Sequence, residues 1–172
     1  MGEIAASAFV LPADLAALSS LEQHVQQMLA LAPPFADAEA VTYNIWLSLH
    51  ELCVNIIGHA YDVPPERRQV HHPETIEIAM QLHSEPLAFE IRTHDRGMHV
   101  FDLDALATPN LDDPPIHGLG IFLIRQLMDE VVYVPAPGNN RWRLVKQLAT
   151  LADATASPAA PFLAGTRQGA RP

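Results

Sequence analysis

The stretch SLHELCVNIIGHAY, Ser48–Tyr61, has the apolar content of a buried helix but carries polar groups in one line. Glu51, Asn55 and His59 follow each other at intervals of four residues, so on a helix they lie along one stripe. The ordinary explanation is the wet side of an amphipathic helix. The functional explanation is a nucleotide–metal site, because a glutamate can accept a proton from a hydroxyl and an asparagine oxygen suits Mg²⁺. The rest of the sequence has to decide between them.

Length and composition restrict the kind of protein. The chain has 172 residues and is 49% hydrophobic, which fits one soluble domain with its own core. Its one cysteine, Cys53, permits no disulfide within the chain and indicates a reducing compartment. The net charge of −10 argues against a nucleic-acid partner. With no apolar run of about 20 residues and no signal sequence, we expect a cytoplasmic protein without a membrane partner.

Hydrophobic periodicity predicts an α+β fold, a two-layer sandwich of helices on a mixed, mostly antiparallel sheet. A single domain is expected over residues 1–150, with the motifs inside 36–148, and a flexible tail over 151–172, where the period is lost. The expected elements are a strand at 7–12, helices at about 14–32 and 37–61, strands at 75–83 and 87–95, a helix after the glycines at 118–120, and a hairpin across 135–140.

Two further motifs carry chemistry. Asp95 ends a predicted strand and Gly97 follows it; this is a common turn, but a carboxylate there can also accept a hydrogen bond from an adenine amine while a glycine leaves room for the ring. Gly118 and Gly120 open a helix, whose first N–H groups can bind phosphate. The spacing matches neither a Rossmann fingerprint nor a P-loop.

Together the three motifs resemble a known family. ELCVNIIGHAY, DRG and GLGIFLIRQLMDEV are similar, in order and spacing, to the N box and the two glycine boxes of the bacterial anti-sigma factor serine/threonine kinases (the RsbW/SpoIIAB-like group). That group belongs to the GHKL, or histidine-kinase-like, ATPase superfamily. The resemblance covers about Ala36 to Leu148 and implies a Bergerat-type ATP-binding fold.

The resemblance implies a role for each matching residue. Glu51 would be the catalytic general base, and Asn55 would bind the Mg²⁺ of Mg-ATP. Asp95 would accept the adenine amine, with Gly97 leaving space for the ring. The second glycine motif would hold the lid over the triphosphate and donate backbone N–H groups; its residues are Gly118, Leu119 and Gly120. His59, part of the family signature, is expected to have a structural role.

The chain also departs from the family pattern around the lid. In DRGMHVFD three residues separate Gly97 from Phe101, so either one residue is inserted or Val100 takes the place of the phenylalanine. His99 and His117 stand where the family often has glycine. We expect these changes to affect the lid, about residues 98–117, more than the base or the metal ligand.

The resemblance implies an ATP-binding anti-sigma regulatory factor that phosphorylates a protein antagonist on serine or threonine. The implied partners are that antagonist, a sigma factor, or both, and by analogy a second copy of the chain, with the helix around Leu15–Leu29 taking part. The alternative is a nucleotide-dependent binding module without phosphoryl transfer. A third possibility, a fragment of a sensor histidine kinase, would need a phosphoacceptor, for which His24 is the candidate.

Overall fold

The structure is a computed structural model, and it describes residues 2–61, 74–101 and 119–152. Within those ranges the chain forms five strands, three α-helices and two short helical turns. In chain order they are β1 (Glu3–Pro12), the 3₁₀ turn η1 (Ala17–Ser20), α1 (Leu21–Leu29), α2 (Ala38–Asn55), the π-helical turn η2 (Ile56–Ala60), β2 (Thr75–Ser84), β3 (Leu87–Asp95), α3 (Leu119–Leu127), β4 (Glu130–Val134) and β5 (Asn140–Gln147).

These elements match the predicted order, with differences in detail. The first strand begins at Glu3, earlier than predicted, because its polar and small residues pair along β2 as readily as its apolar ones. The first predicted helix is divided into η1 and α1, and Asp14 accepts the backbone N–H of Ala17 at 2.8 Å where η1 begins. The predicted second helix continues to Ala60, but its last turn widens into η2.

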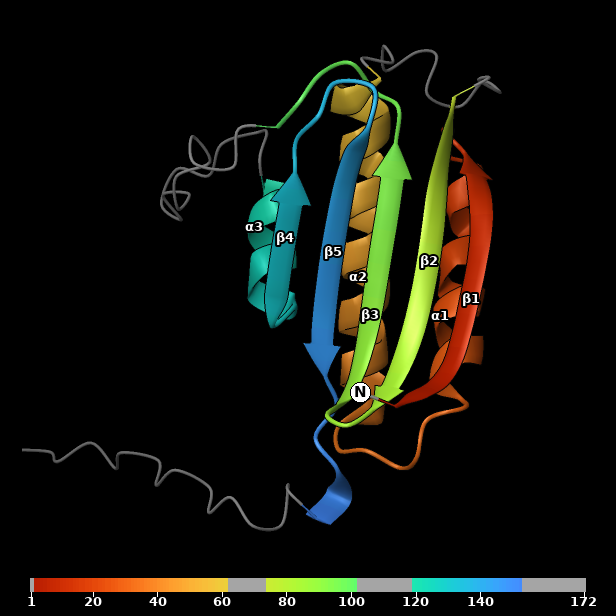
Figure 1. Cartoon of the computed structure of the whole chain (residues 1–172). Helices are drawn as coiled ribbons and strands as arrows, with labels where there is room; N and C mark the ends of the chain where they lie inside the picture. The colour runs from red at the N-terminus through yellow and green to blue at the C-terminus, as the bar shows by residue number, and fades with distance from the viewer. Residues whose placement is uncertain (1, 62–73, 102–118, 153–172) are drawn as a thin grey trace, which may run out of the picture.

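The sheet has the order β1-β2-β3-β5-β4, and all four pairings are antiparallel (Figure 1). In the central pair, Asp95 at the end of β3 lies opposite Asn140 at the start of β5. The two residues come from segments 45 positions apart, so this register is what unites the first glycine motif with the last strand.

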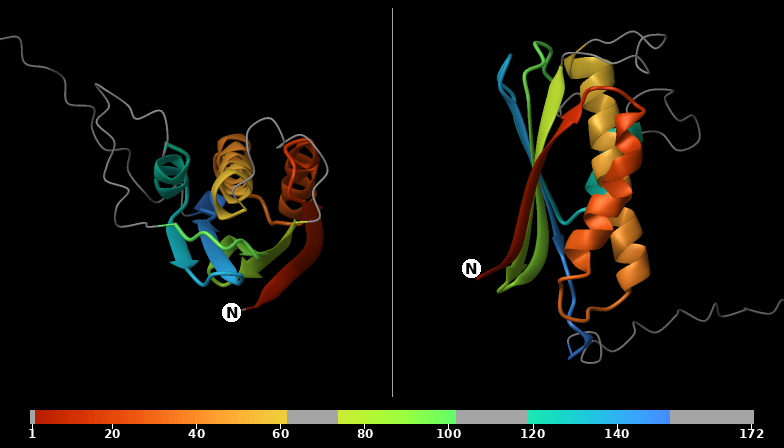
Figure 2. Two further views of the ribbon diagram at one scale, coloured as in Figure 1. Left: turned by 90° about the horizontal axis from the view of Figure 1, so that it is seen from above. Right: turned by 90° about the vertical axis from the view of Figure 1, so that its right-hand side faces the viewer.

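All three α-helices cover the same face of the sheet, which leaves the other face open (Figure 2). The predicted α+β sandwich is therefore confirmed. Side chains alternate along β2, and its inward set enters the core between the layers; that set is Ile76, Ile78, Met80 and Leu82. These residues share one buried apolar core with residues of α1 and α2, such as Val25 and Leu49.

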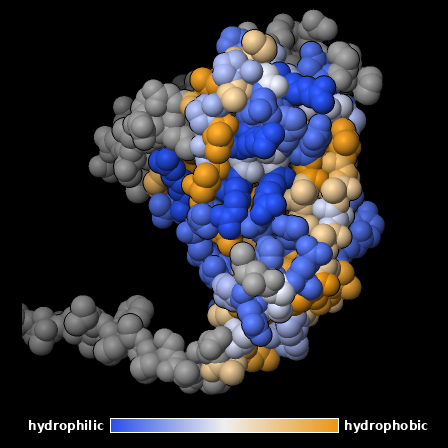
Figure 3. Space-filling model, in the orientation of Figure 1, coloured by the Kyte–Doolittle hydropathy of each residue, from blue (hydrophilic) through white to orange (hydrophobic). Residues whose placement is uncertain are grey.

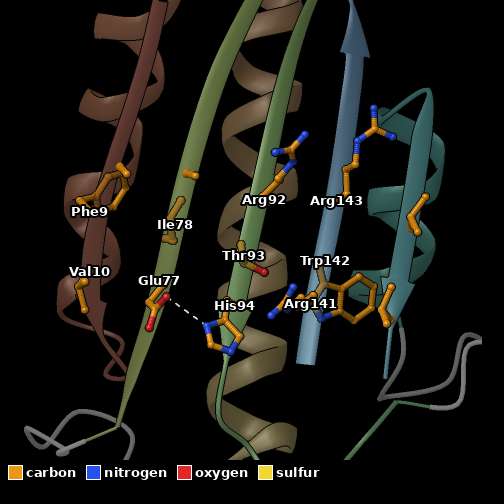
Figure 4. Close-up of a pocket in the computed structure, with 14 residues that line it drawn as sticks. Phe9, Val10, Glu77, Ile78, Arg92, Thr93, His94, Arg141, Trp142 and Arg143 are labelled. Atoms are coloured by element: carbon orange, nitrogen blue, oxygen red, sulfur yellow. Dashed lines mark hydrogen bonds and ion pairs between the residues drawn. The ribbon is translucent and has the colours of Figure 1, made fainter. Parts of the chain in front are cut away.

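The open face of the sheet is apolar at its edges and charged in the middle (Figure 3). Val10 on β1, with 60% of its surface exposed, and Val134 on β4 lie on either side of three arginines of β3 and β5, which are Arg92, Arg141 and Arg143 (Figure 4). Between them Glu90 is buried and accepts a hydrogen bond from the Arg143 guanidinium at 2.8 Å. A hollow of about 650 Å³ opens on this face, with Glu77 bonded to His94 beside it (Figure 4).

The apolar side of α1 packs within the chain's own core. Leu21, Val25, Met28 and Leu29 are all buried there. The helix that sequence analogy assigned to a dimer contact thus has its apolar surface already covered. None of the helices in the described part of the chain is long and apolar enough to cross a membrane.

Candidate functional site

The polar stripe of α2 is not a uniform solvent-facing side. Ser48 is fully buried and donates its hydroxyl to the carbonyl of Asn44 at 2.8 Å, as a serine does inside a packed helix. One turn later Glu51 keeps 28% of its side chain exposed, and Asn55 is half-buried. The amide nitrogen of Asn55 is itself buried without a hydrogen-bond partner, which is costly unless a ligand completes the site.

Gly120 brings the second glycine motif against this stripe. A Cβ atom built on Gly120 would lie 2.8 Å from Asn55 Nδ2 and 2.9 Å from Glu51 Oε2. Because these atoms are the ends of flexible side chains, a larger residue at position 120 would displace the Glu51 carboxylate and the Asn55 amide. The structure therefore places the carboxylate, the amide and the N-terminal turn of α3 around one point, as a phosphate–metal site would require.

The first glycine motif lies against the end of the same helix. The turn η2 is closed by a hydrogen bond from the Tyr61 N–H to the Ile56 carbonyl, five residues back, at 3.2 Å. Its last residue, Ala60, has its carbonyl oxygen only 2.4 Å from where a Cβ on Gly97 would be. Any side chain at this position would push the chain away from η2, so the close contact explains the glycine.

Asp95, at the end of β3, is a buried carboxylate beside the first glycine motif. It is 1% exposed, and its Oδ1 accepts two hydrogen bonds of 3.0 Å, from the Gly97 N–H and from Asn140 Nδ2. Its Oδ2 is buried with no partner. Burial raises the pKa of Asp95, and the two hydrogen bonds act in the opposite direction. A buried acceptor oxygen without a donor fits an amine such as that of adenine.

Sequence reasoning missed Asn140 and Tyr133, which support Asp95. The Tyr133 hydroxyl donates to Asn140 Oδ1 at 3.1 Å and accepts the N–H of Phe101 at 3.2 Å. The signal that could have found Asn140 is the register of β3 against β5, which periodicity does not reveal. Tyr133 can be placed only once β4 is paired with β5, because side chains alternate along β4 and Tyr133 is on its more buried side.

Phe101, rather than Val100, joins the aromatic side chains beside the first glycine motif. Phe101 packs edge-on against Trp142 and Tyr133, with ring centroids 5.5 Å and 5.9 Å away. Val100 is exposed. His99, one of the three residues between Gly97 and Phe101, donates its N–H to the Ala60 carbonyl.

The remaining predicted residues have simpler positions. His59 is exposed on η2 and packs edge-on against Phe101 at 5.6 Å, which agrees with a structural role. His24 is stacked on Phe9 at 4.1 Å, and its Nδ1 is 2.8 Å from the Ser20 carbonyl. Leu119 begins α3.

Some of the predictions fall outside the described residues. Gly118 is one of these, as is the predicted lid from residue 102 onward. No group of three or more potential metal-binding side chains occurs among residues 2–61, 74–101 and 119–152. None of the predicted site residues lines the hollow on the open face, so the two regions are separate.

Comparison with known proteins identifies the family. Residues 11–146, most of the chain, match the model of the histidine kinase-like ATPase domain. The chain belongs to this family, as the resemblance of its three motifs predicted. No curated protein sequence matches it.

A solved structure supports the same fold. The crystal structure of the RsbU and RsbW domains of Rv1364c from Mycobacterium tuberculosis is similar, with a TM-score of 0.56 and 15% identity over 85% of this chain. The match covers 34% of that chain, so the present chain spans about a third of its length. A weaker similarity is to the histidine kinase domain of the blue-light activated kinase from Erythrobacter litoralis EL346, with a TM-score of 0.48 and 14% identity, covering 80% of this chain and 61% of that one.

Proposed function

We propose that the chain is an ATP-binding regulatory protein of the anti-sigma factor type, with serine/threonine kinase activity toward a protein antagonist. The observation that carries the proposal is the convergence of Glu51, Asn55 and Gly120 on one point, together with the unpartnered carboxylate oxygen of Asp95. The first group suits a metal-bound triphosphate, and the second suits an adenine amine. Membership of the histidine kinase-like ATPase family supports both assignments.

The residues present fit Mg-ATP. Asn55 would hold Mg²⁺ through its side-chain oxygen. Its buried, unpartnered amide nitrogen is a donor, which suits an acceptor such as a phosphate oxygen. The ion would neutralise charge on the phosphates during transfer. Asp95 would accept the amine of the base through Oδ2, while the N–H groups that open α3, including those of Leu119, Gly120 and, by the motif, Gly118, would face the phosphates.

Glu51 is proposed as the catalytic base. It is partly exposed and so reachable by an incoming hydroxyl. The serine or threonine oxygen would attack the γ-phosphorus, the bond from that phosphorus to the β–γ bridging oxygen would break, and ADP would leave. The hydroxyl proton would go to the Glu51 carboxylate.

The partners are part of the proposal. From the motif resemblance to the RsbW/SpoIIAB-like group we propose an anti-sigma factor antagonist, a sigma factor, or both as the partner proteins, while the Rv1364c structure supports the fold. A homodimer is also proposed. Because the apolar side of α1 is buried, the dimer contact would have to use other surface, such as the open sheet face with Val10 and Val134.

Phosphate transfer from γ-labelled ATP into a protein of the source cell's extract tests the proposal. With the wild-type chain added, we expect label on serine or threonine of a new protein. Glu51→Gln should abolish this label while keeping Mg-ATP binding. Glu39→Gln, an identical change at an exposed position in the first turn of the same helix, should preserve both. Absence of label with the wild-type chain, despite ATP binding, would favour the binding module without phosphoryl transfer. Absence of ATP binding would contradict both the kinase and the nucleotide-dependent binding module.

A further inference from the structure

Asn140 controls what Asp95 can offer to a ligand. It is 1% exposed, lies opposite Asp95 across the β3–β5 pair, and donates through Nδ2 to two close acceptors. These acceptors are Asp95 Oδ1 at 3.0 Å and the Gly97 carbonyl at 2.9 Å, and the His99 carbonyl lies farther away at 3.5 Å. The amide therefore connects the carboxylate to the backbone of the first glycine motif.

The orientation of the Asn140 amide is determined by its other end. Its Oδ1 accepts the backbone N–H of Ala136 and the hydroxyl of Tyr133, both at 3.1 Å. A backbone N–H can only donate, so the atom that it contacts must be the oxygen. The Tyr133 hydroxyl accepts the N–H of Phe101, which leaves its single hydrogen for Asn140. The nitrogen of Asn140 must then face Asp95.

This arrangement uses one oxygen of Asp95 and leaves the other. Oδ1 is occupied by the Gly97 N–H and by Asn140, while Oδ2 is buried with no partner. Asn140 in turn has two amide hydrogens, and two close acceptors face them. Among these described groups, the unmet demand is thus one buried acceptor, which calls for one donor from a ligand.

We propose that Asn140, held in place by Tyr133, is a positioning residue that fixes Asp95 as a single-oxygen acceptor and so sets the preference for a purine carrying a 6-amino group. This inference rests on the proposed nucleotide-binding function. A base with a carbonyl at that position would face an acceptor with an acceptor, and a purine with only hydrogen there would leave Oδ2 unpaired.

Selectivity between two nucleotides distinguishes positioning from simple structural support. Binding of Mg-ATP and of Mg-purine riboside triphosphate, which lacks the 6-amino group, would be measured by calorimetry for the wild type, Asn140→Ser and Asn139→Ser. Asn139 is the exposed neighbour and serves as the matched control. We expect Asn140→Ser to reduce the preference for ATP by about tenfold, as for a lost hydrogen bond to a charged group. Asn139→Ser should keep the wild-type preference.

A more conservative variant tests the same inference if Asn140→Ser does not fold. Tyr133→Phe retains the ring stacked on Trp142 at 4.1 Å and removes the hydroxyl, which donates to Asn140 and accepts the Phe101 N–H. It should reduce the ATP preference in the same direction, whereas Tyr43→Phe on the exposed side of α2 should not.

Equal losses for both nucleotides, or an unchanged preference in folded Asn140→Ser or Tyr133→Phe, would overturn the inference and leave the proposed function standing. If the wild type bound neither nucleotide, the proposed function and this inference would both be wrong.

Discussion

Asp95 keeps a carboxylate where almost no water reaches it, and two donors on one oxygen compensate only part of the cost. Its pKa is raised by burial, so the native protein holds a proton at pH values where the unfolded chain has lost it. Stability is therefore expected to fall as the pH rises from about 4 through the raised pKa of Asp95.

Asp95→Asn should separate stability from binding. The asparagine removes the buried charge while its oxygen can still accept from Gly97 and Asn140, so we expect the melting temperature at pH 7 to rise by a few degrees. The new amide would present a donor where an adenine amine needs an acceptor, so ATP binding should be lost. Thermal unfolding across pH 4–8 and calorimetry check this. A variant that is less stable at pH 7, or that binds ATP normally, would contradict it.

Cys53 gives an independent test of the packing of α2. It is fully buried among apolar residues, and burial raises its pKa to about 12. Because the thiolate is the reactive form, we expect no labelling by a thiol reagent at pH 8 in the folded protein and complete labelling in denaturant. Rapid labelling of the native protein, followed by absorbance, would show that this face of the helix is not packed as described.

Two glycines allow neighbouring elements to lie close to α2 and to η2, which continues it. Substitution of the two should have different effects, one on stability and the other on binding. Gly97→Ala would place a methyl group against the backbone carbonyl of Ala60, which cannot easily move. We expect a loss of about 1–3 kcal/mol in the free energy of unfolding, measured by chemical denaturation. A stability equal to that of the wild type would show that this contact is looser than described.

Gly120→Ala meets only the ends of the Glu51 and Asn55 side chains. Alanine also suits the first turn of α3, so the stability should stay within about 0.5 kcal/mol of the wild type. The displaced carboxylate and amide should nonetheless weaken Mg-ATP binding by about tenfold or more, which corresponds to about 1.4 kcal/mol. An unchanged affinity for Mg-ATP in this variant would show that Gly120 is not part of the binding site.

The order of the helices and strands could be predicted because each element has its own hydrophobic periodicity and is bounded by proline, glycine or other turn residues. The alternation in β2 and β3 and the motif spacing around Glu51 and Gly120 are local signals, and the resemblance of the motifs added the fold. The role of Asn140 could not be predicted in this way. It depends on a strand register between residues 45 positions apart, and the residue itself looks like part of an ordinary turn.

At the scale of the whole molecule, we propose that residues 1–150 form the folding unit. The last strand along the chain is β5; just after it Leu148 donates its N–H to the Leu87 carbonyl, and Phe35 forms a β-bridge with Thr150. A chain ending at residue 152 should keep the melting temperature within about a degree and keep its affinity for Mg-ATP. Differential scanning calorimetry on both lengths tests this, and a large loss in the shorter chain would extend the domain into residues 153–172.

The central claim is that the stripe of α2 and the two glycine motifs form one Mg-ATP site. Calorimetric titration of the wild type, Asn55→Ala and Asn44→Ala with Mg-ATP tests it most directly, since Asn44 lies on the same helix and provides the matched control. We expect magnesium-dependent binding by the wild type and by Asn44→Ala, and loss of this binding in Asn55→Ala. Failure of the wild type to bind, or equal binding by all three proteins, would contradict it.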